Sequence, residues 1–293
     1  MKFSILIPAY KDIFLKEAID SVLSQTYKDF ELIIVNDASP FNVDSIVSQY
    51  KDSRIHYYIN TKNCGAKDVV DNWNICLSYA SGDYLLCMGD DDCLSPTCLE
   101  EYCNAIIKFP DVEIFHAGTV VIDEKSVKVE TLEIRPEFES VFSLIPSIQP
   151  SGLGSYLYRT ESLRSNGGFF KLPYGWTSDF VSAIMVAKDK GIVNIQTVEF
   201  QFRGSSQQIS HDMKCIEDKI VALIHYRQWV LSFLRTTNSK SSKEEIEKES
   251  ALACIDSNVE RLIDDLIEFD IRTNFSRCLY WLRKSGKFDI SLH

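Results

Sequence analysis

The sequence predicts an α/β fold in which a mostly parallel sheet is flanked by helices on both faces. Over the first hundred residues, short apolar runs typical of buried strands alternate with apolar residues at helical spacing. Polar clusters directly follow several of these runs. Strands that alternate with helices pair in parallel through right-handed crossovers, and such sheets bind ligands at the carboxyl ends of their strands. We therefore expect the functional groups at those strand ends.

The predicted elements of the first hundred residues follow one another in a regular order. Strands are predicted where the chain has continuous or alternating apolar runs, at residues 3–7, 31–35, 54–59 and 84–88. Helices are predicted where apolar residues recur at helical spacing, at residues 15–23, 43–50 and 69–80. Each predicted helix connects two predicted strands, as crossover helices do.

Beyond residue 100 the pattern is less regular. Residues 111–142 predict shorter strands with an exposed turn at Asp123-Glu124-Lys125. Residues 146–155 form a loop rich in small residues, which either lies close to a ligand or is a plain surface connection. The later signals are helical apart from one polar linker: helices around 179–190 and 216–234, the linker at 236–243, and an amphipathic stripe of Leu262, Ile263, Leu266, Ile267 and Phe269. We expect one α/β domain over residues 1–212 and a C-terminal helical extension over 213–293.

The composition is that of a globular protein with an acidic balance. The 293 residues carry 31 Lys and Arg against 42 Asp and Glu, a formal net charge of −11. This argues against a nucleic-acid partner, because such binding needs a positive footprint. No apolar stretch approaches the ~20 residues of a membrane-spanning helix, and the apolar start is too short for a good signal peptide. We expect a cytoplasmic protein whose nine cysteines are reduced and mostly buried.

Residues 272–287 differ from the rest of the chain because they carry five basic residues, no acidic residue and several aromatic residues. Such a segment either makes a peripheral contact with an anionic membrane, at its inner face, or is a terminal helix that packs its aromatic side chains on the domain. The second interpretation is favoured. The last helices are also candidates for a homo-oligomer surface or for a lid over the core.

The sharpest chemical signal is Gly89-Asp90-Asp91-Asp92, directly after the predicted strand at 84–88. Adjacent carboxylates raise one another's pKa unless a cation is present, and Mg²⁺ or Mn²⁺ prefers oxygen ligands. Two further clusters follow earlier strands. In Asn36-Asp37-Ala38-Ser39-Pro40, a carboxylate either accepts a hydrogen bond from a base or sugar or caps the next helix. In residues 60–67, Gly65 permits close backbone approach, and Lys67 is placed to meet a phosphate.

These clusters belong to a longer, ordered series of motifs. The series comprises Phe3-Ser4-Ile5-Leu6-Ile7-Pro8-Ala9-Tyr10, the runs 18–27 and 29–39, Asn63-x-Gly65, Asn74, Ala80-x-Gly82-x-Tyr84 and Gly89-Asp90-Asp91-Asp92-x-x-x-Pro96. It resembles the inverting family 2 glycosyltransferases of the GT-A fold. The resemblance is dense over residues 3–100, sparse to residue 212 and absent from the tail. It implies a GT-A catalytic domain over residues 1–212.

The resemblance also implies roles for single residues on the donor side. The implied nucleotide-binding positions are Pro8, Ala9, Tyr10, Asp37, Gly65, Lys67 and Asp90. Asp37 would accept the N3–H of a uracil or thymine ring. Asp91 matches the metal-binding aspartate of the DXD motif, and Asp92 would join it in holding Mn²⁺ or Mg²⁺. The metal would neutralise the diphosphate leaving group.

On the acceptor side, the segment from Trp176 to Phe180 resembles the family's general-base segment at the start of a helix. Asp179 would deprotonate the acceptor hydroxyl, or else it is an ordinary first-turn acid. Ser178 stands where the family usually has Glu. Trp176 either stacks on a sugar face or belongs to the core. Further along, Arg203 is a candidate for a phosphate contact, and His211 is a candidate for the metal shell.

The sequence departs from the family pattern on the donor side as well. Gly89 stands where the first DXD aspartate is usual, and Asn36 replaces the first acid of the common Asp-Asp pair. The interval from Asn63 to Asn74 is longer than in the common pattern, and Trp73 stands where Arg is usual. These departures concern the donor pocket and leave Asp37, Asp91 and the base in place.

The expected function is metal-dependent, inverting transfer of a sugar from a nucleotide-diphosphate sugar, expected to be UDP-linked, to a hydroxyl of a glycan or lipid-linked glycan acceptor. By family analogy the setting is bacterial surface polysaccharide or lipopolysaccharide biosynthesis. One alternative is a catalytically degenerate nucleotide-sugar binding or scaffold protein. Another is a sugar-1-phosphate nucleotidyltransferase, although the glycine-rich phosphate loop it needs does not appear. A dinucleotide-dependent dehydrogenase is disfavoured because no G-x-G-x-x-G follows the first strand.

Overall fold

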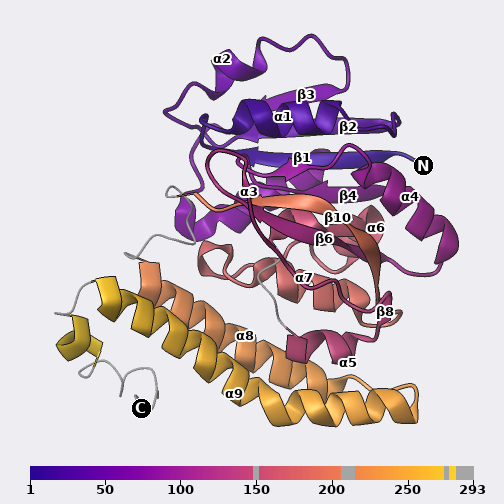
Figure 1. Ribbon diagram of the computed structural model, residues 1–293, viewed down its shortest axis with the longest axis vertical. Coiled ribbons are helices and arrows are strands. Elements are labelled where there is room, and N and C mark those ends of the chain that lie inside the picture. The colour runs from indigo at the N-terminus through magenta and orange to yellow at the C-terminus, as the bar shows by residue number, and fades with distance from the viewer. Residues whose placement is uncertain (148–151, 206–214, 274–276, 282–293) are drawn as a thin grey trace.

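The computed structural model describes residues 1–147, 152–205, 215–273 and 277–281. These residues form one curved sheet with helices on both faces (Figure 1). The main strand order is β3-β2-β1-β4-β9-β6-β10-β5, with β7 paired to β6 and β8 paired to β10. The α/β prediction is therefore confirmed.

The first half of the chain builds the parallel part of the sheet. Its elements are β1 (Phe3–Ala9), α1 (Leu15–Leu23), β2 (Phe30–Asn36), α2 (Val43–Val47), β3 (Ile55–Ile59), η1 (Ala66–Asp68), α3 (Val69–Tyr79) and β4 (Tyr84–Cys87). Strand β1 pairs in parallel with both β2 and β4, and β2 pairs in parallel with β3. Every residue of β2 is buried, because helices cover both faces of the sheet there. Each strand and helix predicted in this half is present.

The second half adds antiparallel strands. Its elements are β5 (Cys93–Leu94), α4 (Cys98–Lys108), β6 (Ile114–Ile122), β7 (Lys128–Thr131), β8 (Phe138–Glu139), α5 (Val141–Leu144), η2 (Ile145–Ser147), η3 (Leu153–Ser155), β9 (Tyr156–Arg159), α6 (Thr160–Ser165), η4 (Pro173–Gly175), α7 (Ser178–Ala187) and β10 (Ile192–Arg203). Strand β9 runs antiparallel between β4 and β6, and β10 runs parallel to β6. The turn predicted at Asp123-Glu124-Lys125 connects β6 to β7.

Two elements of this half depart from the sequence pattern. Strand β6 spans nine residues, longer than the short strands predicted for this region. Strand β10 was not predicted, because Gln196 and Thr197, at the irregularity in its pairing with β6, divide it into two short runs, of which only the second alternates regularly. Part of the small-residue loop at 146–155 lies outside the described residues, and η3 forms its last turn.

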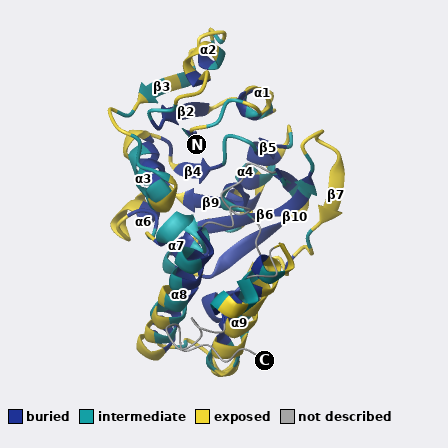
Figure 2. Ribbon diagram, turned by 90° about the vertical axis from the view of Figure 1, so that its left-hand side faces the viewer, coloured by how far each residue is buried: buried dark blue, intermediate teal, exposed yellow. Residues whose placement is uncertain are grey.

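The helices divide into two layers with separate apolar clusters. Helices α1, α2 and α4 pack on one face of the sheet, where their side chains share a cluster with β1 and β2. Helices α3, α5, α6 and α7 pack on the other face. Helices α8 (Ile216–Thr236) and α9 (Ser242–Thr273) join this second cluster and lie side by side (Figures 1 and 2). The helical extension thus shares its core with the α/β part of the chain, while the expected boundary at residue 212 lies outside the described residues.

Helix α9 differs from its predicted pattern. It begins at Ser242, well before the predicted stripe, and its buried apolar side chains recur every four residues: Ala251, Ile255, Val259, Ile263 and Ile267. Of the predicted stripe, Ile263 and Ile267 are buried, Leu262 and Leu266 are partly buried, and Phe269 is exposed. The first half of α9 was missed because its first turns are dominated by charged and polar residues, from Ser242 to Ser250.

The described part of the basic C-terminal segment packs on the protein. The indole of Trp281 is buried and donates a hydrogen bond of 2.7 Å from Nε1 to Asp270 Oδ2, the atom that also pairs with Arg277 Nε at 2.8 Å. No helix in the described ranges is both long and apolar enough to cross a membrane. All nine cysteines are free thiols.

Candidate active site

The carboxyl ends of β1 and β2, together with the loop after β3, enclose the carboxylate of Asp37. This side chain is buried and accepts hydrogen bonds from Asn60 Nδ2 at 2.8 Å and from the main-chain N–H of Cys64 at 3.0 Å. The main-chain N–H of Asp37 donates to the carbonyl of Ala9 at 2.9 Å. Two of the three predicted polar clusters, residues 36–40 and 60–67, therefore meet beside the end of β1, and groups from the second cluster fix the Asp37 carboxylate.

The other residues predicted to line a nucleobase pocket lie beside Asp37. Ala9 is buried, Pro8 is half-buried and Tyr10 is exposed. The ring of Tyr10 meets the ring of Phe41 edge to face, with 5.8 Å between their centroids. Phe41 was not among the predicted site residues, although an aromatic residue in a polar loop after a strand was the available signal. Together the two exposed rings offer an apolar surface for a flat ligand.

Asp90 joins the acidic turn after β4 to the end of β1. Its Oδ2 accepts the main-chain N–H groups of Tyr10 and Lys11, each at 2.7 Å. Burial, followed by the neighbouring charge of Asp91, raises the pKa of Asp90 to about 6. This bond places the acidic turn directly beside the residues that surround Asp37.

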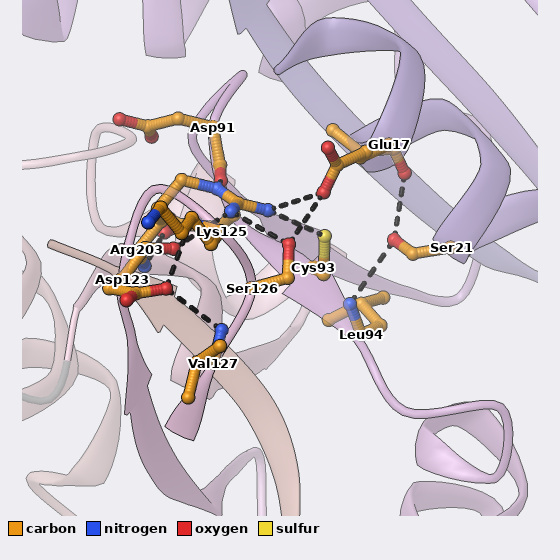
Figure 3. Close-up of polar contacts among 12 residues, drawn as sticks. Glu17, Ser21, Asp91, Cys93, Leu94, Asp123, Lys125, Ser126, Val127 and Arg203 are labelled. Carbon is orange, nitrogen blue, oxygen red and sulfur yellow. Dashed lines mark hydrogen bonds and ion pairs between the residues drawn. The ribbon is translucent and has the colours of Figure 1, made fainter. Parts of the chain in front are cut away.

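The carboxylates of Asp91 and Asp92 both lie beside Gly89, where an added Cβ would meet Asp91 Oδ1 at 2.8 Å and Asp92 Oδ2 at 3.0 Å. The carboxylate of Asp92 is buried and accepts main-chain N–H groups from Arg203 at 3.0 Å and from Gly89 at 3.3 Å. Burial, and then the charge of Asp91, raise the pKa of Asp92 well above its ordinary value. The main-chain carbonyl of Asp91 accepts a bond from Arg203, while its carboxylate points away from that guanidinium (Figure 3). The two carboxylates are therefore close together, and main-chain N–H groups hold that of Asp92.

The carboxylates of the acidic turn can hold a divalent cation only together with ligands from the substrate. Within the described ranges, no three His, Cys, Asp or Glu side chains converge closely enough to hold a metal by themselves. Mg²⁺ commonly binds through one or two carboxylates together with substrate phosphates. The adjacent carboxylates of Asp91 and Asp92, with Asp90 next to them, fit that partial set. The predicted ligand His211 lies outside the described residues.

The predicted base stands in the first turn of α7. The Oδ1 atom of Asp179 accepts the N–H of Phe180 at 2.9 Å, and its carbonyl accepts the hydroxyl of Tyr158 at 3.2 Å. Burial raises the pKa of Asp179 to about 6. A carboxylate with such a pKa is ionised at neutral pH and basic enough to take a proton from a hydroxyl in a transition state.

The neighbours of Asp179 are held by packing. The hydroxyl of Ser178 is buried and accepts the N–H of Leu172 at 3.0 Å, which gives this residue a structural contact. Trp176 is half-buried, and the ammonium of Lys219 in α8 lies 4.9 Å from the centre of an indole ring. Tyr174 and Thr177 adopt positive φ angles of 60° and 64°, which are strained for residues other than glycine.

Two predicted phosphate contacts are engaged within the protein. Lys67, which follows Gly65 at the start of η1, forms an ion pair of 2.8 Å with Asp218 in α8. Arg203 is completely buried, and its three guanidinium nitrogens bond to protein atoms (Figure 3). A phosphate contact by Arg203 would require those bonds to be replaced. Neither Asp218 nor the Glu17 partner of Arg203 was predicted, because each comes from a distant segment.

Comparison with known proteins adds the family. The sequence matches the model described as glycosyl transferase family 2 over residues 4–165. An uncharacterized glycosyltransferase of Rickettsia typhi is 33% identical over 125 residues, covering 42% of this chain and 38% of that protein, so the chain spans well under half of its length. The Escherichia coli UDP-Glc:alpha-D-GlcNAc-diphosphoundecaprenol beta-1,3-glucosyltransferase WfgD is 25% identical over 210 residues, covering 71% of this chain and 79% of that protein.

Solved structures agree on the fold. Staphylococcus aureus TarS 1–349 in complex with UDP-GlcNAc has a TM-score of 0.62 at 18% identity and covers 99% of this chain and 89% of that chain. The Pyrobaculum calidifontis mannosyltransferase PcManGT in complex with GDP-Man and Mn²⁺ has a TM-score of 0.59 at 15% identity. The match covers 94% of this chain and 75% of that chain. These likenesses confirm the GT-A fold. Because the family model covers more than half of it, the chain belongs to glycosyl transferase family 2.

Proposed function

We propose that this protein transfers a sugar from a nucleotide-diphosphate sugar, UDP-linked, to a hydroxyl acceptor by a single inverting displacement. One observation carries the proposal: Asp90 bonds the acidic turn after β4 to the end of β1, directly beside Asp37 after β2. A carboxylate suited to a nucleobase and one suited to a metal-bound diphosphate therefore lie along one edge of adjacent parallel strands. Binding at that edge is the rule for sheets of this kind.

In the proposed mechanism the chain positions the two substrates and moves one proton. The exposed rings of Tyr10 and Phe41 hold the nucleobase, whose N3–H donates to Asp37. Asp91 and Asp92, with Asp90 next to them, would hold a Mn²⁺ or Mg²⁺ ion, which would offset the negative charge of the departing diphosphate. Asp179 accepts the proton of the acceptor hydroxyl as its oxygen attacks the anomeric carbon from the face opposite the nucleotide.

The acceptor is proposed from a relative. WfgD is described as acting on GlcNAc-diphosphoundecaprenol, and we assign a glycan or lipid-linked glycan acceptor to this chain on that basis. Cytoplasmic surface-polysaccharide assembly is the setting that such an acceptor implies. Peripheral membrane contact through residues 272–287 stays a prediction, as does a homo-oligomer. The burial of Trp281 favours packing for the described part of that segment.

Calorimetric titration with UDP, dTDP and GDP, each with Mn²⁺ and with EDTA, tests the donor side. We expect the tightest binding for UDP, and tighter binding with Mn²⁺ than with EDTA. The absence of binding by all three nucleotides at millimolar concentration would contradict a nucleotide-sugar donor. Retention of metal-dependent UDP binding without transfer to any glycan acceptor would instead favour the degenerate binding protein.

A further inference from the structure

We propose that Arg203 is a positioning residue that holds the main chain of the acidic turn so that the Asp91 carboxylate faces the metal-bound diphosphate. The proposal rests on the proposed function, since it concerns the same site. Arg203 is the last residue of β10 and lies more than a hundred residues beyond the turn in sequence. Its side chain is completely buried.

The guanidinium of Arg203 connects three separate segments (Figure 3). Its Nε donates to the carbonyl of Asp91 at 2.7 Å, and its Nη1 donates to the carbonyl of Asp123 at 3.0 Å and to Ser126 Oγ at 2.9 Å. Its Nη2 pairs with Glu17 Oε2 on α1 at 2.8 Å. The acidic turn, the β6–β7 turn and α1 therefore share one planar cation.

The main chain of Arg203 supplies a second bond to the same turn. Its N–H donates to Asp92 Oδ1 at 3.0 Å, so consecutive turn residues are held by the same residue, one through a carbonyl and one through a carboxylate. Because the main-chain carbonyl of Asp91 faces Arg203, the carboxylate of Asp91 points away from the guanidinium. Second-shell contacts of this kind orient metal ligands, and their loss commonly lowers metal affinity by about 10–100-fold.

The chemistry of the site requires arginine. A guanidinium is planar and donates in several fixed directions, whereas an ammonium is a compact charge at the end of a flexible stem. Lysine at this position can reach one of the partners but cannot donate to Asp91, Asp123 and Glu17 together. Phe14 lies under the guanidinium, with 4.3 Å from Cζ to the ring centroid, and adds a flat packing surface that suits arginine.

The test is calorimetric binding of UDP to the full chain carrying Arg203→Lys, once with Mn²⁺ and once with EDTA. We expect the affinity with Mn²⁺ to fall about tenfold or more, while the affinity in EDTA stays within about twofold of the unsubstituted protein. Arg54→Lys is the matched control, because Arg54 also pairs with a carboxylate, Asp52, at 2.7 Å and lies 4.3 Å above a ring, that of Phe30. The control should bind UDP normally under both conditions.

A second variant covers the case in which Arg203→Lys does not fold. Ser126→Ala removes one acceptor of the guanidinium on an exposed turn, and we expect a smaller loss, about twofold, again only with Mn²⁺. Equal losses with Mn²⁺ and EDTA, or no loss in either variant, would overturn the positioning role. UDP binding by the unsubstituted protein that does not depend on Mn²⁺ would overturn the metal part of the proposed function as well, which separates the two failures.

Discussion

The donor side and the acceptor side of the proposed site are built differently. On the donor side, Asp37 and Asp90 accept main-chain N–H groups from neighbouring strand ends. On the acceptor side, Asp179 accepts an N–H from its own helix, which begins after two non-glycine residues with positive φ and packs near α8. Strand ends fix the first arrangement, whereas long-range packing and local strain fix the second. Substitutions on the two sides should therefore affect different steps.

The largest effect is expected from Asp179→Asn. The amide cannot take a proton from the acceptor, and general-base catalysis typically contributes about 10²–10⁴-fold. We expect kcat for sugar transfer to fall about 10³-fold while UDP affinity changes less than about twofold. Steady-state transfer assays and calorimetry measure both quantities. Asp189→Asn is the control, because this exposed side chain follows the same helix, and its transfer rate should be normal. Full activity in Asp179→Asn would assign the base elsewhere.

Asp37→Asn should weaken UDP binding and change kcat little, the reverse of the effect expected for Asp179→Asn. An amide places an N–H₂ where the carboxylate now accepts from Asn60 and Cys64, and hydrogen bonds to charged groups are worth about 1.5–3 kcal/mol. We expect UDP affinity to fall about tenfold or more, with a much smaller change in kcat at saturating donor. Asp20→Asn on the exposed face of α1 is the control. Unchanged UDP affinity in Asp37→Asn, with a normal melting temperature, would place the nucleobase away from Asp37.

The pH dependence of sugar transfer tests whether Asp179, and no other group on the acceptor side, is the base. The pKa of Asp179 is raised to about 6 by burial, so the carboxyl becomes protonated and inactive as pH falls through that value. Because the pKa of Asp90 on the donor side is also raised to about 6, the quantity to follow is kcat at saturating donor. We expect it to be level above pH 7 and to fall toward tenfold per unit below pH 6. Tyr158, whose hydroxyl reaches the Asp179 carbonyl, titrates far above this range. A level profile between pH 5 and 7 would show that Asp179 does not limit the reaction.

The same contrast explains how much could be predicted from the sequence. The first half of the sheet was predicted correctly, because each strand there is a continuous or alternating apolar run and each polar cluster follows directly in sequence. The clusters that contain Asp37 and Asp91 could be located from that order, while the roles of the two residues were implied only by the family resemblance. Strand β10 could not, because the adjacent polar residues Gln196 and Thr197 lie at its pairing irregularity and divide its alternation into two short runs. The network of Arg203 with Glu17 could not either, since 186 positions separate the partners and neither has a local pattern.

The smallest effect is expected where the two sides meet, at the ion pair between Lys67 of η1 and Asp218 of α8. The pair is largely exposed, so its loss should cost less than about 1 kcal/mol of stability. Lys67→Ala and Asp218→Asn therefore should lower the melting temperature slightly and equally if the lysine only joins η1 to α8. If Lys67 also contacts the donor phosphates, Lys67→Ala alone should weaken UDP binding, while Asp218→Asn should leave it unchanged or strengthen it. Thermal unfolding and calorimetry on the two variants therefore decide between two roles of Lys67. In one it only joins η1 to α8, and in the other it also binds the donor.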